Sequence, residues 1–161
     1  MISSKATIGK NVEIGNYVVI EDGVVIGDHT VIKNFVELRK NTIVGSGCYI
    51  DSRVSTSGDC RIGNNVTLRY GAIVARGCDV GDDSYVCPHV MTNNLDTGQE
   101  SIGGAKIGRR CFIGTNCVIQ HGITIGDDVV TGSMSFVTKS IPDGEVWLGS
   151  PAKFFKKNVP K

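Results

Sequence analysis

The chain has 161 residues, enough for one domain, and its 17 basic residues nearly balance its 16 acidic ones. This balance excludes a protein-wide electrostatic attraction to nucleic acid or to an anionic membrane. Apolar runs are too short for a transmembrane helix, and the first residues enter a repeat directly, so we expect no signal peptide and a cytoplasmic protein.

A six-residue period begins at Ile2 and continues to Thr92. Every sixth residue in this block is Ile, Leu or Val, except Thr56 and Thr92. An amphipathic helix needs apolar residues three and four apart, whereas short β-branched segments separated by Gly, Asn and Asp predict brief strands joined by tight corners. A fixed short period is typical of a solenoid, in which each repeat buries its apolar side against its neighbours.

Three hexads, about 18 residues, close one triangular coil, so residues eighteen apart should lie above one another at the strand spacing of about 4.8 Å. The sequence therefore predicts an all-β fold, a parallel β-helix of about seven triangular coils. We expect a β-helix domain at 1–144, a loop inserted at about 94–106 and a short C-terminal tail at 145–161 that packs on the helix.

Five of the six cysteines share the fifth position of a hexad, which elsewhere holds Val, Ala, Thr or Ser. They are Cys48, Cys60, Cys78, Cys111 and Cys117. A small, weakly polar thiol suits an inward site, and no cysteine pair has zinc spacing. We therefore expect reduced cysteines in the core, as in cytoplasmic proteins.

The period breaks between Asn94 and Lys106, where the composition is that of an exposed loop. Such loops often carry function when they leave a rigid scaffold. The period resumes at Ile107, and its fifth position stays small or branched as far as Ile141. If the coil resumes on its next face, Asn94, His121 and Lys139 form one corner column.

The same count predicts a second corner column. It contains Pro88, Thr115 and Ser133, with His89 beside Asn116 and Met134. The tail that follows the repeat interleaves Trp147, Phe154 and Phe155 with lysines, so its rings could dock on the sheet while its ammonium groups stay at the rim.

The repeated [Ile/Leu/Val]-Gly-x-x-small-x pattern, with the stretch IGTNCVIQHGITIGDDVVTGSMSFVTKSIPDGEVWLGSPAK, resembles the hexapeptide-repeat acyltransferases. The resemblance implies a left-handed parallel β-helix, usually a trimer with acyl-coenzyme A in grooves between subunits and a loop covering the site. The sequence MTNN entering the loop is most similar to nucleotide-amino-sugar N-acetyltransferases, whereas galactoside-type O-acetyltransferases have a His-Pro pair there.

The resemblance implies acetyl-coenzyme A-dependent N-acetylation of a nucleotide-linked amino sugar in cell-surface polysaccharide biosynthesis. The implied assembly is a homotrimer, and no metal is expected. Six residues match positions that bind the cofactor in the family: Thr115 and Ser133 at the pantetheine arm, Thr138 and Lys139 near the adenosine, and Lys153 and Lys156 near the phosphates. Lysine is a suitable point charge for the phosphates of coenzyme A.

Candidate catalytic residues come from the corners and the loop. His121 is the best-placed base for the amine proton, and His89 could face the same groove. Asn93 and Asn94 match positions that present an asparagine to the substrate amine, and Asp96 could accept a proton or bind sugar hydroxyls.

Three alternatives stay open at this point. A sugar or antibiotic O-acetyltransferase of the same fold would need a histidine base. A zinc hydrase resembling a carbonic anhydrase needs three converging histidines, and His89 and His121 do not have that spacing. A non-catalytic β-helix scaffold would not bind coenzyme A.

Overall fold

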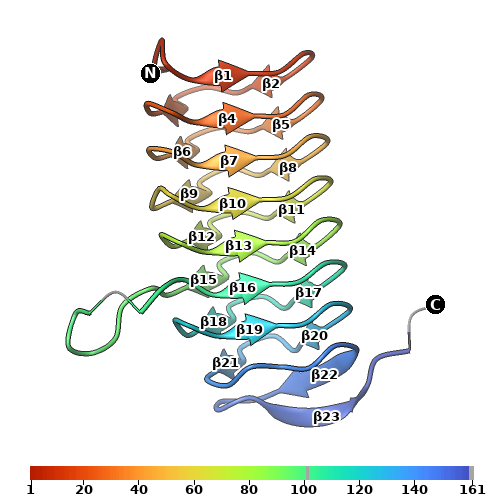
Figure 1. The fold of residues 1–161 in the computed structure, drawn as a ribbon. Coiled ribbons are helices and arrows are strands. Elements are labelled where there is room, and N and C mark those ends of the chain that lie inside the picture. Colours follow the sequence, from red (N-terminus) through yellow and green to blue (C-terminus); the bar gives the residue numbers. More distant parts are fainter. Residues whose placement is uncertain (101, 160–161) are drawn as a thin grey trace.

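The structure, a computed structural model, describes residues 1–100 and 102–159. Residue Ser101 of the predicted loop and the terminal Lys161 lie outside the described residues. Short parallel strands form three sheets that wrap around a triangular prism (Figure 1). We name each sheet after its first strand.

The β1 sheet contains β1 (Thr7–Ile8), β4 (Val25–Ile26), β7 (Ile43–Val44), β10 (Arg61–Ile62), β13 (Asp79–Val80), β16 (Lys106–Ile107) and β19 (Thr124–Ile125). The β2 sheet contains β2 (Glu13–Ile14), β5 (Val31–Ile32), β8 (Tyr49–Ile50), β11 (Thr67–Leu68), β14 (Tyr85–Val86), β17 (Phe112–Ile113), β20 (Val130–Thr131), β22 (Glu145–Leu148) and β23 (Lys153–Lys157). The β3 sheet contains β3 (Val19–Ile20), β6 (Glu37–Leu38), β9 (Ser55–Thr56), β12 (Ile73–Val74), β15 (Met91–Thr92), β18 (Val118–Ile119) and β21 (Phe136–Val137).

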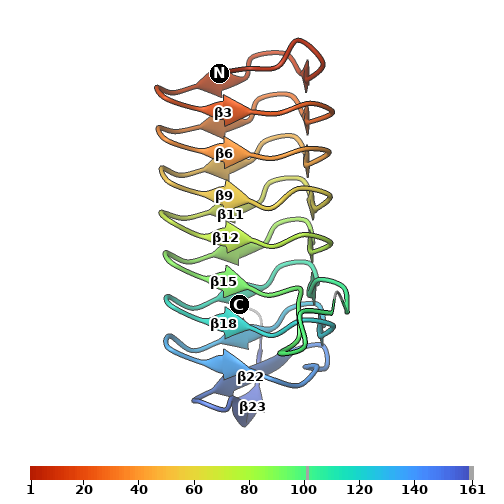
Figure 2. The same ribbon diagram turned by 90° about the vertical axis from the view of Figure 1, so that its left-hand side faces the viewer.

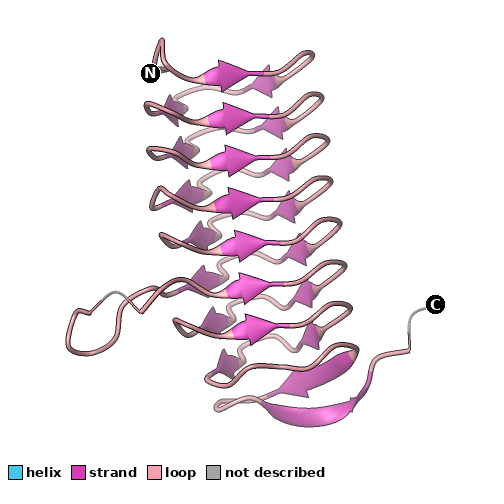
Figure 3. Ribbon diagram, viewed as in Figure 1, coloured by secondary structure: helices cyan, strands magenta, loops and turns pink. Residues whose placement is uncertain are grey.

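The coil is left-handed. In Figure 1 the chain crosses the front along β1, returns behind along β2 and β3, and reaches β4 one level further from the N-terminus. Figure 2 faces the β3 sheet and shows the same regular stacking. Within the described part of the chain every regular element is a strand (Figure 3), and no helix is long and apolar enough to cross a membrane. The predicted all-β, left-handed parallel β-helix is confirmed.

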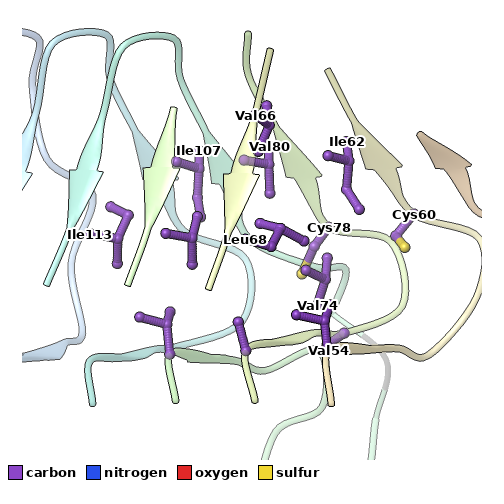
Figure 4. Close-up of a cluster of buried hydrophobic side chains, with 14 of the residues drawn as sticks. Val54, Cys60, Ile62, Val66, Leu68, Val74, Cys78, Val80, Ile107 and Ile113 are labelled. Carbon is purple, nitrogen blue, oxygen red and sulfur yellow. The ribbon is translucent and has the colours of Figure 1, made fainter. Parts of the chain in front are cut away.

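The hexad pattern sets which side chains enter the prism. In nearly every two-residue strand the second residue is buried and the first faces outward. Ile62, Val80 and Ile107 consequently stack in register through neighbouring coils, as Figure 4 shows for the middle of the core. The apolar ladder supplies the hydrophobic stabilisation that no single coil could supply alone.

The fifth hexad position has a specific hydrogen-bonding task. Its hydroxyl or thiol donates to the carbonyl of a corner glycine in the next coil. The donors and acceptors are Thr30 to Gly45, Cys48 to Gly63, Ser84 to Gly108, Cys111 to Gly126 and Cys117 to Gly132, at 2.9–3.0 Å. Thr, Ser and Cys are small enough to be buried there and still satisfy a backbone carbonyl, which explains why they alternate with Val and Ala.

The cysteines are free thiols in the core, as predicted. Burial raises the pKa of Cys111 to about 11, and it also raises the pKa of Cys48, Cys60 and Cys78. Because all five fifth-position thiols are buried and out of reach of a reagent, we expect none of them to react with a thiol reagent such as Ellman's reagent at pH 8 while the protein is folded. All six cysteines should react once denaturant is added. Rapid labelling of the native protein at Cys48, Cys60, Cys78, Cys111 or Cys117 would contradict the inward assignment.

The last corner departs from the predicted hexads. The sequence pattern puts Ile141 at the fifth position of a hexad, but Ile141 lies opposite Ile125, at a first position. This prediction is wrong because the corner is two residues shorter than its predecessor. The hydroxyl of Ser140 accepts from the Thr124 amide at 3.1 Å, and the Ile141 amide donates to the Thr124 carbonyl at 2.9 Å, so the short corner still satisfies its neighbour.

The tail extends the β2 sheet. β22 pairs with β20 in parallel, and β23 then returns antiparallel along the outer edge of β22. The division into a β-helix domain at 1–144 and a tail at 145–161 stays a prediction.

Candidate active site

The inserted loop leaves the prism after β15 and returns before β16. Met91 lies opposite Val118, a separation of 27 residues, whereas regular coils pair residues 18 apart. Figure 1 shows the loop (green) projecting away from the prism at this level. Because the register resumes unchanged on both sides, the insertion alters the surface without disturbing the stack.

Both ends of the loop are anchored at the corner that contains His121. On the outgoing side the Asn93 amide donates to the Ile119 carbonyl at 2.9 Å. On the return, the Gly122 amide donates to the Gly103 carbonyl at 3.1 Å. His121, which is half-buried, therefore lies between the exit and the return of the loop.

The tip of the loop is a tight turn closed by Asp96. The Asp96 amide donates to the Glu100 carbonyl at 3.1 Å, and a carboxylate oxygen of Asp96 accepts from the Glu100 amide at 2.9 Å. One of the two carboxylate oxygens of Asp96, the residue predicted to bind sugar hydroxyls, is therefore engaged in closing the loop turn.

A pocket of about 320 Å³ lies one coil beyond His121, between the last corner and the tail. Thr138, Lys139 and Lys153, three of the residues predicted to bind the cofactor, line it together. Trp147 and Phe154 contribute apolar walls, and Pro151 and Ala152 complete it. β21 ends directly before Thr138, and the β22–β23 pair brings Lys153 back to the same corner.

Glu145 fixes the tail that forms the pocket wall. Its carboxylate accepts from the Lys157 ammonium at 2.7 Å and from the Trp147 indole nitrogen at 2.8 Å. These two hydrogen bonds, the one from Lys157 foremost, lower the pKa of Glu145. Trp147 is therefore held in one orientation, as a preformed binding surface requires.

The positive charges at the pocket are not neutralised. Lys157 is paired with Glu145, but within residues 1–100 and 102–159 no carboxylate pairs with Lys139 or Lys153. Two unpaired ammonium groups above an aromatic wall suit an anion joined to a planar ring. Lys156 does not line this pocket, and its ammonium lies 5.9 Å from the centre of the Phe155 ring.

The second predicted column occupies a different edge of the prism. The Asn116 amide donates to the Pro88 carbonyl at 3.0 Å, and the Met134 amide donates to the Thr115 carbonyl at 2.8 Å, so the predicted stacking is confirmed. His89 is exposed here, with its ring against the edge of Tyr70 at 5.4 Å.

The β3 sheet separates the two columns. His89, Thr115 and Ser133 lie where the chain enters this sheet from the β2 sheet, and His121 and Lys139 lie where it leaves towards the β1 sheet. One chain therefore does not bring His89 beside His121. The two histidines lie at opposite edges of the β3 sheet, so the prediction that both face one groove requires a second copy of the chain.

The pocket walls were not assigned by sequence reasoning. Trp147 and Phe154 were expected only to dock on the sheet, whereas both line the pocket beside Lys139 and Lys153. The alternation of EVWL and KFFKK around the turn at residues 149–152 was the available signal for a hairpin. Among the described residues, no group of three His, Cys, Asp or Glu side chains is close enough together to hold a metal ion.

A profile of the bacterial transferase hexapeptide (six repeats) matches residues 5–40, 41–76 and 104–139, more than half of the chain. The chain belongs to the bacterial transferase hexapeptide family. In this hexapeptide-family protein the unmatched interval between the second and third ranges contains most of the inserted loop. The family repeat thus accounts for most of the scaffold, and the unmatched interval holds β13, β14 and β15 as well as the loop.

Curated relatives of this hexapeptide-family protein include the bifunctional protein GlmU of Synechococcus sp. (strain CC9311), 28% identical over 152 residues, which are 94% of this chain and 29% of that protein. GlmU of Trichodesmium erythraeum (strain IMS101) is 30% identical over 156 residues, covering 97% of this chain and 28% of that protein. The chain thus spans less than a third of the length of these relatives.

Solved structures share the fold of this hexapeptide-family protein. The UDP-N-acetylglucosamine acyltransferase from Campylobacter jejuni superposes with a TM-score of 0.79 at 17% identity, covering 98% of this chain and 72% of that one. A variant of AntD, an N-acyltransferase from Bacillus cereus, was solved with dTDP-4-amino-4,6-dideoxyglucose and coenzyme A. It gives a TM-score of 0.64 at 19% identity and covers 96% of this chain and 84% of that one.

Proposed function

We propose that this protein is an acyl-coenzyme A-dependent acetyltransferase that acetylates the amine of a nucleotide-linked amino sugar, in cell-surface polysaccharide biosynthesis. The observation that carries the proposal is the pocket in which Thr138, Lys139 and Lys153 meet the Trp147 and Phe154 rings. Membership of a transferase family supports the reaction class. The coenzyme A and amino-sugar nucleotide bound to AntD support the choice of substrates.

The residues of the pocket fit coenzyme A. Its phosphates need cations, and Lys139 and Lys153 supply two that have no carboxylate partner in the described chain. Its adenine ring needs a flat apolar surface, which Trp147 and Phe154 offer. Thr115 and Ser133, on the other edge of the β3 sheet, are proposed to contact the pantetheine arm through their backbone, and Lys156 is proposed to approach the phosphates from outside the pocket.

Acyl transfer requires an aligned amine and an acceptor for its proton. His121 lies at the corner from which the loop leaves and returns, one coil from the pocket. We assign it the role of base, with Asn93 and Asn94, at the start of the loop, orienting the amine. Asp96 is proposed to contact the sugar with the oxygen that the loop turn does not use.

The proposed enzyme works as a homotrimer in the cytoplasm, without a metal. His89 is proposed to reach the site of a neighbouring copy in that trimer. O-acetylation of a sugar is the second candidate, favoured by the accessible imidazole of His121, since a hydroxyl nucleophile depends more strongly on a base.

Lys139→Ala and Lys153→Ala provide the direct test. Each should raise the KM for acetyl-coenzyme A about 10- to 150-fold, because a charge-assisted hydrogen bond to phosphate contributes about 1.5–3 kcal/mol. The kcat should change little, since these contacts exist equally in the ground and transition states. Lys10→Ala, an exposed lysine on the first coil, is the matched control. Unchanged affinity for coenzyme A in both pocket variants, measured by calorimetry, would refute the pocket assignment.

A further inference from the structure

The hairpin of β22 and β23 lies across the C-terminal end of the prism (Figure 1), and backbone hydrogen bonds attach it along its length. At its turn, the Phe136 amide donates to the Gly149 carbonyl at 2.9 Å, and the Ala152 amide donates to the Phe136 carbonyl at 2.8 Å. In the middle of β22, the Gly132 amide donates to the Trp147 carbonyl at 2.9 Å. The path of the first strand is thus fixed by the coil beneath it.

The base of the hairpin is closed by Asn158. Its backbone amide donates to the Gly144 carbonyl at 2.8 Å, and its side-chain amide donates to the Asp128 carbonyl at 2.8 Å. These attachments at the turn, the strand and the base do not involve the side chain of Glu145. A variant of Glu145 should therefore keep the backbone of the hairpin in place.

The side chain of Glu145 is unusually enclosed for a charged group. Among the ion pairs of residues 1–100 and 102–159 its carboxylate is the least exposed, at 12%, whereas the other paired carboxylates are 17–50% exposed. A buried carboxylate is costly unless its oxygens accept hydrogen bonds. Glu145 meets this need with one partner for each oxygen, the Lys157 ammonium and the Trp147 indole nitrogen.

The indole of Trp147 has one hydrogen-bonding group, its ring nitrogen, and Glu145 holds it. Trp147 lines the pocket together with Phe154, the residue opposite it across the hairpin. A tryptophan side chain turns about two bonds, so a single hydrogen bond at the ring nitrogen is enough to select one orientation of the ring. Glu145 therefore selects the orientation in which the indole forms the pocket wall.

We propose that Glu145 is a positioning residue for the acyl donor, acting through the Trp147 indole. Glu145 does not itself line the pocket. Because the indole is already oriented, its rotation does not have to be frozen when the adenine ring binds, and the entropic cost of binding is lower. This inference rests on the proposed function, since it takes the pocket as the site of coenzyme A.

Glu145 also neutralises a third lysine near the pocket. The Lys157 ammonium lies 6.0 Å from the centre of the Phe154 ring, which lines the pocket, and it is paired with Glu145. A substitution that removes the carboxylate therefore frees a cation as well as the indole. A test of the positioning role must compare variants that have the same charge.

Glu145→Gln and Glu145→Ala form such a pair. Both remove one negative charge, but only glutamine keeps a carbonyl oxygen that can accept from the indole nitrogen. The dissociation constant of coenzyme A, measured by calorimetry, should be about three- to tenfold higher for Glu145→Ala than for Glu145→Gln, the range for the loss of one aromatic contact. The KM for acetyl-coenzyme A should rise by the same factor, with kcat within about twofold, because the indole contacts the donor equally in the ground and transition states.

The orientation of the indole can be measured without any ligand. Trp147 is the only tryptophan of the chain, so its fluorescence reports on this one ring. Time-resolved anisotropy should show a fixed indole in the wild type and in Glu145→Gln, and fast local rotation in Glu145→Ala. Both variants should stay folded, because the backbone attachments of the hairpin remain, and thermal unfolding checks this. A purely structural role of Glu145 would not separate two folded variants in this way.

Asp79→Asn is the matched control, because it removes a carboxylate that lies 2.6 Å from the Lys106 ammonium on the β1 sheet. It should change neither affinity nor anisotropy. If Glu145→Ala does not fold, Glu145→Met, which keeps the length of the side chain, takes its place. Equal affinities for coenzyme A, or equal anisotropies, in the glutamine and alanine variants would overturn the positioning role. A wild type that does not bind coenzyme A would refute the proposed function instead, and the anisotropy of the free proteins would still decide whether Glu145 orients the indole.

Discussion

His121→Asn should lower kcat about 10²–10⁴-fold, the usual contribution of a positioned general base. The KM for acetyl-coenzyme A should stay nearly constant, because the pocket of Lys139 and Lys153 does not include this residue. Asparagine keeps a polar side chain at the corner, so the hydrogen bonds that anchor the loop, which use backbone groups, should be retained. Initial rates of thiol release across substrate concentrations give both constants.

Two further histidines serve as comparisons for that experiment. His29→Asn, on the first coils, should have full activity. His89→Asn should lose activity only to the extent that His89 enters the cleft between copies, and the trimer must be verified for it. A His121 variant that keeps at least half of the wild-type kcat would remove the base assignment and favour orientation of a neutral amine by Asn93 and Asn94.

Gly104→Ala should destabilise the protein by about 2–3 kcal/mol, the range for overpacking a filled site. Gly104 is buried where the loop rejoins the stack, and a Cβ there would clash with the Cys78 amide nitrogen and the Gly77 carbonyl carbon and would lie 2.6 Å from the Cys78 sulfur. Backbone of the preceding coil cannot move aside without breaking its own ladder. For a chain of this size the melting temperature should fall by roughly 5–10 °C.

The matched comparison is Gly98→Ala in the same loop. A Cβ at Gly98 would lie 3.3 Å from the Asp96 carboxylate, at an exposed part of the loop. The backbone of Gly98 is not left-handed, so alanine is not strained there. Its melting temperature should therefore differ from that of the wild type by a degree or so. Equal melting temperatures for the two variants would mean that the loop return is not packed against residues 77–78.

The scaffold was readable from the sequence because one rule holds outside the inserted loop and the last corner: residues eighteen apart pair in neighbouring strands. The stacking of Val118 and Ile119 under Phe136 and Val137, and of Thr115 under Ser133, follows from that rule alone. The rule failed at Ile141, because the corner before it is two residues shorter than the others. At this corner the Thr124 amide donates to the Ser140 side-chain hydroxyl. The six-residue period does not reveal this shorter corner, because serine is common at any corner.

The site was only partly readable for a different reason. Lys139 and Lys153 are close only because β22 and β23 form a hairpin, and the sequence showed aromatic residues and lysines there without a turn of known geometry. Whether His89 and His121 share a groove depends on a neighbouring copy, and the sequence pattern of one chain does not show which surfaces of two copies are in contact.

The loop begins and ends at adjacent coils of the same corner, and this has a consequence for how specificity can change. Its two stems are fixed by the stack, so lengthening the excursion leaves the donor pocket and the imidazole where they are, and doubling a flexible loop adds only about 0.6 kcal/mol of closure entropy. The specificity for the acyl acceptor can therefore change through insertions or substitutions in this one loop, with little effect on the stability of the chain or on its binding of the acyl donor.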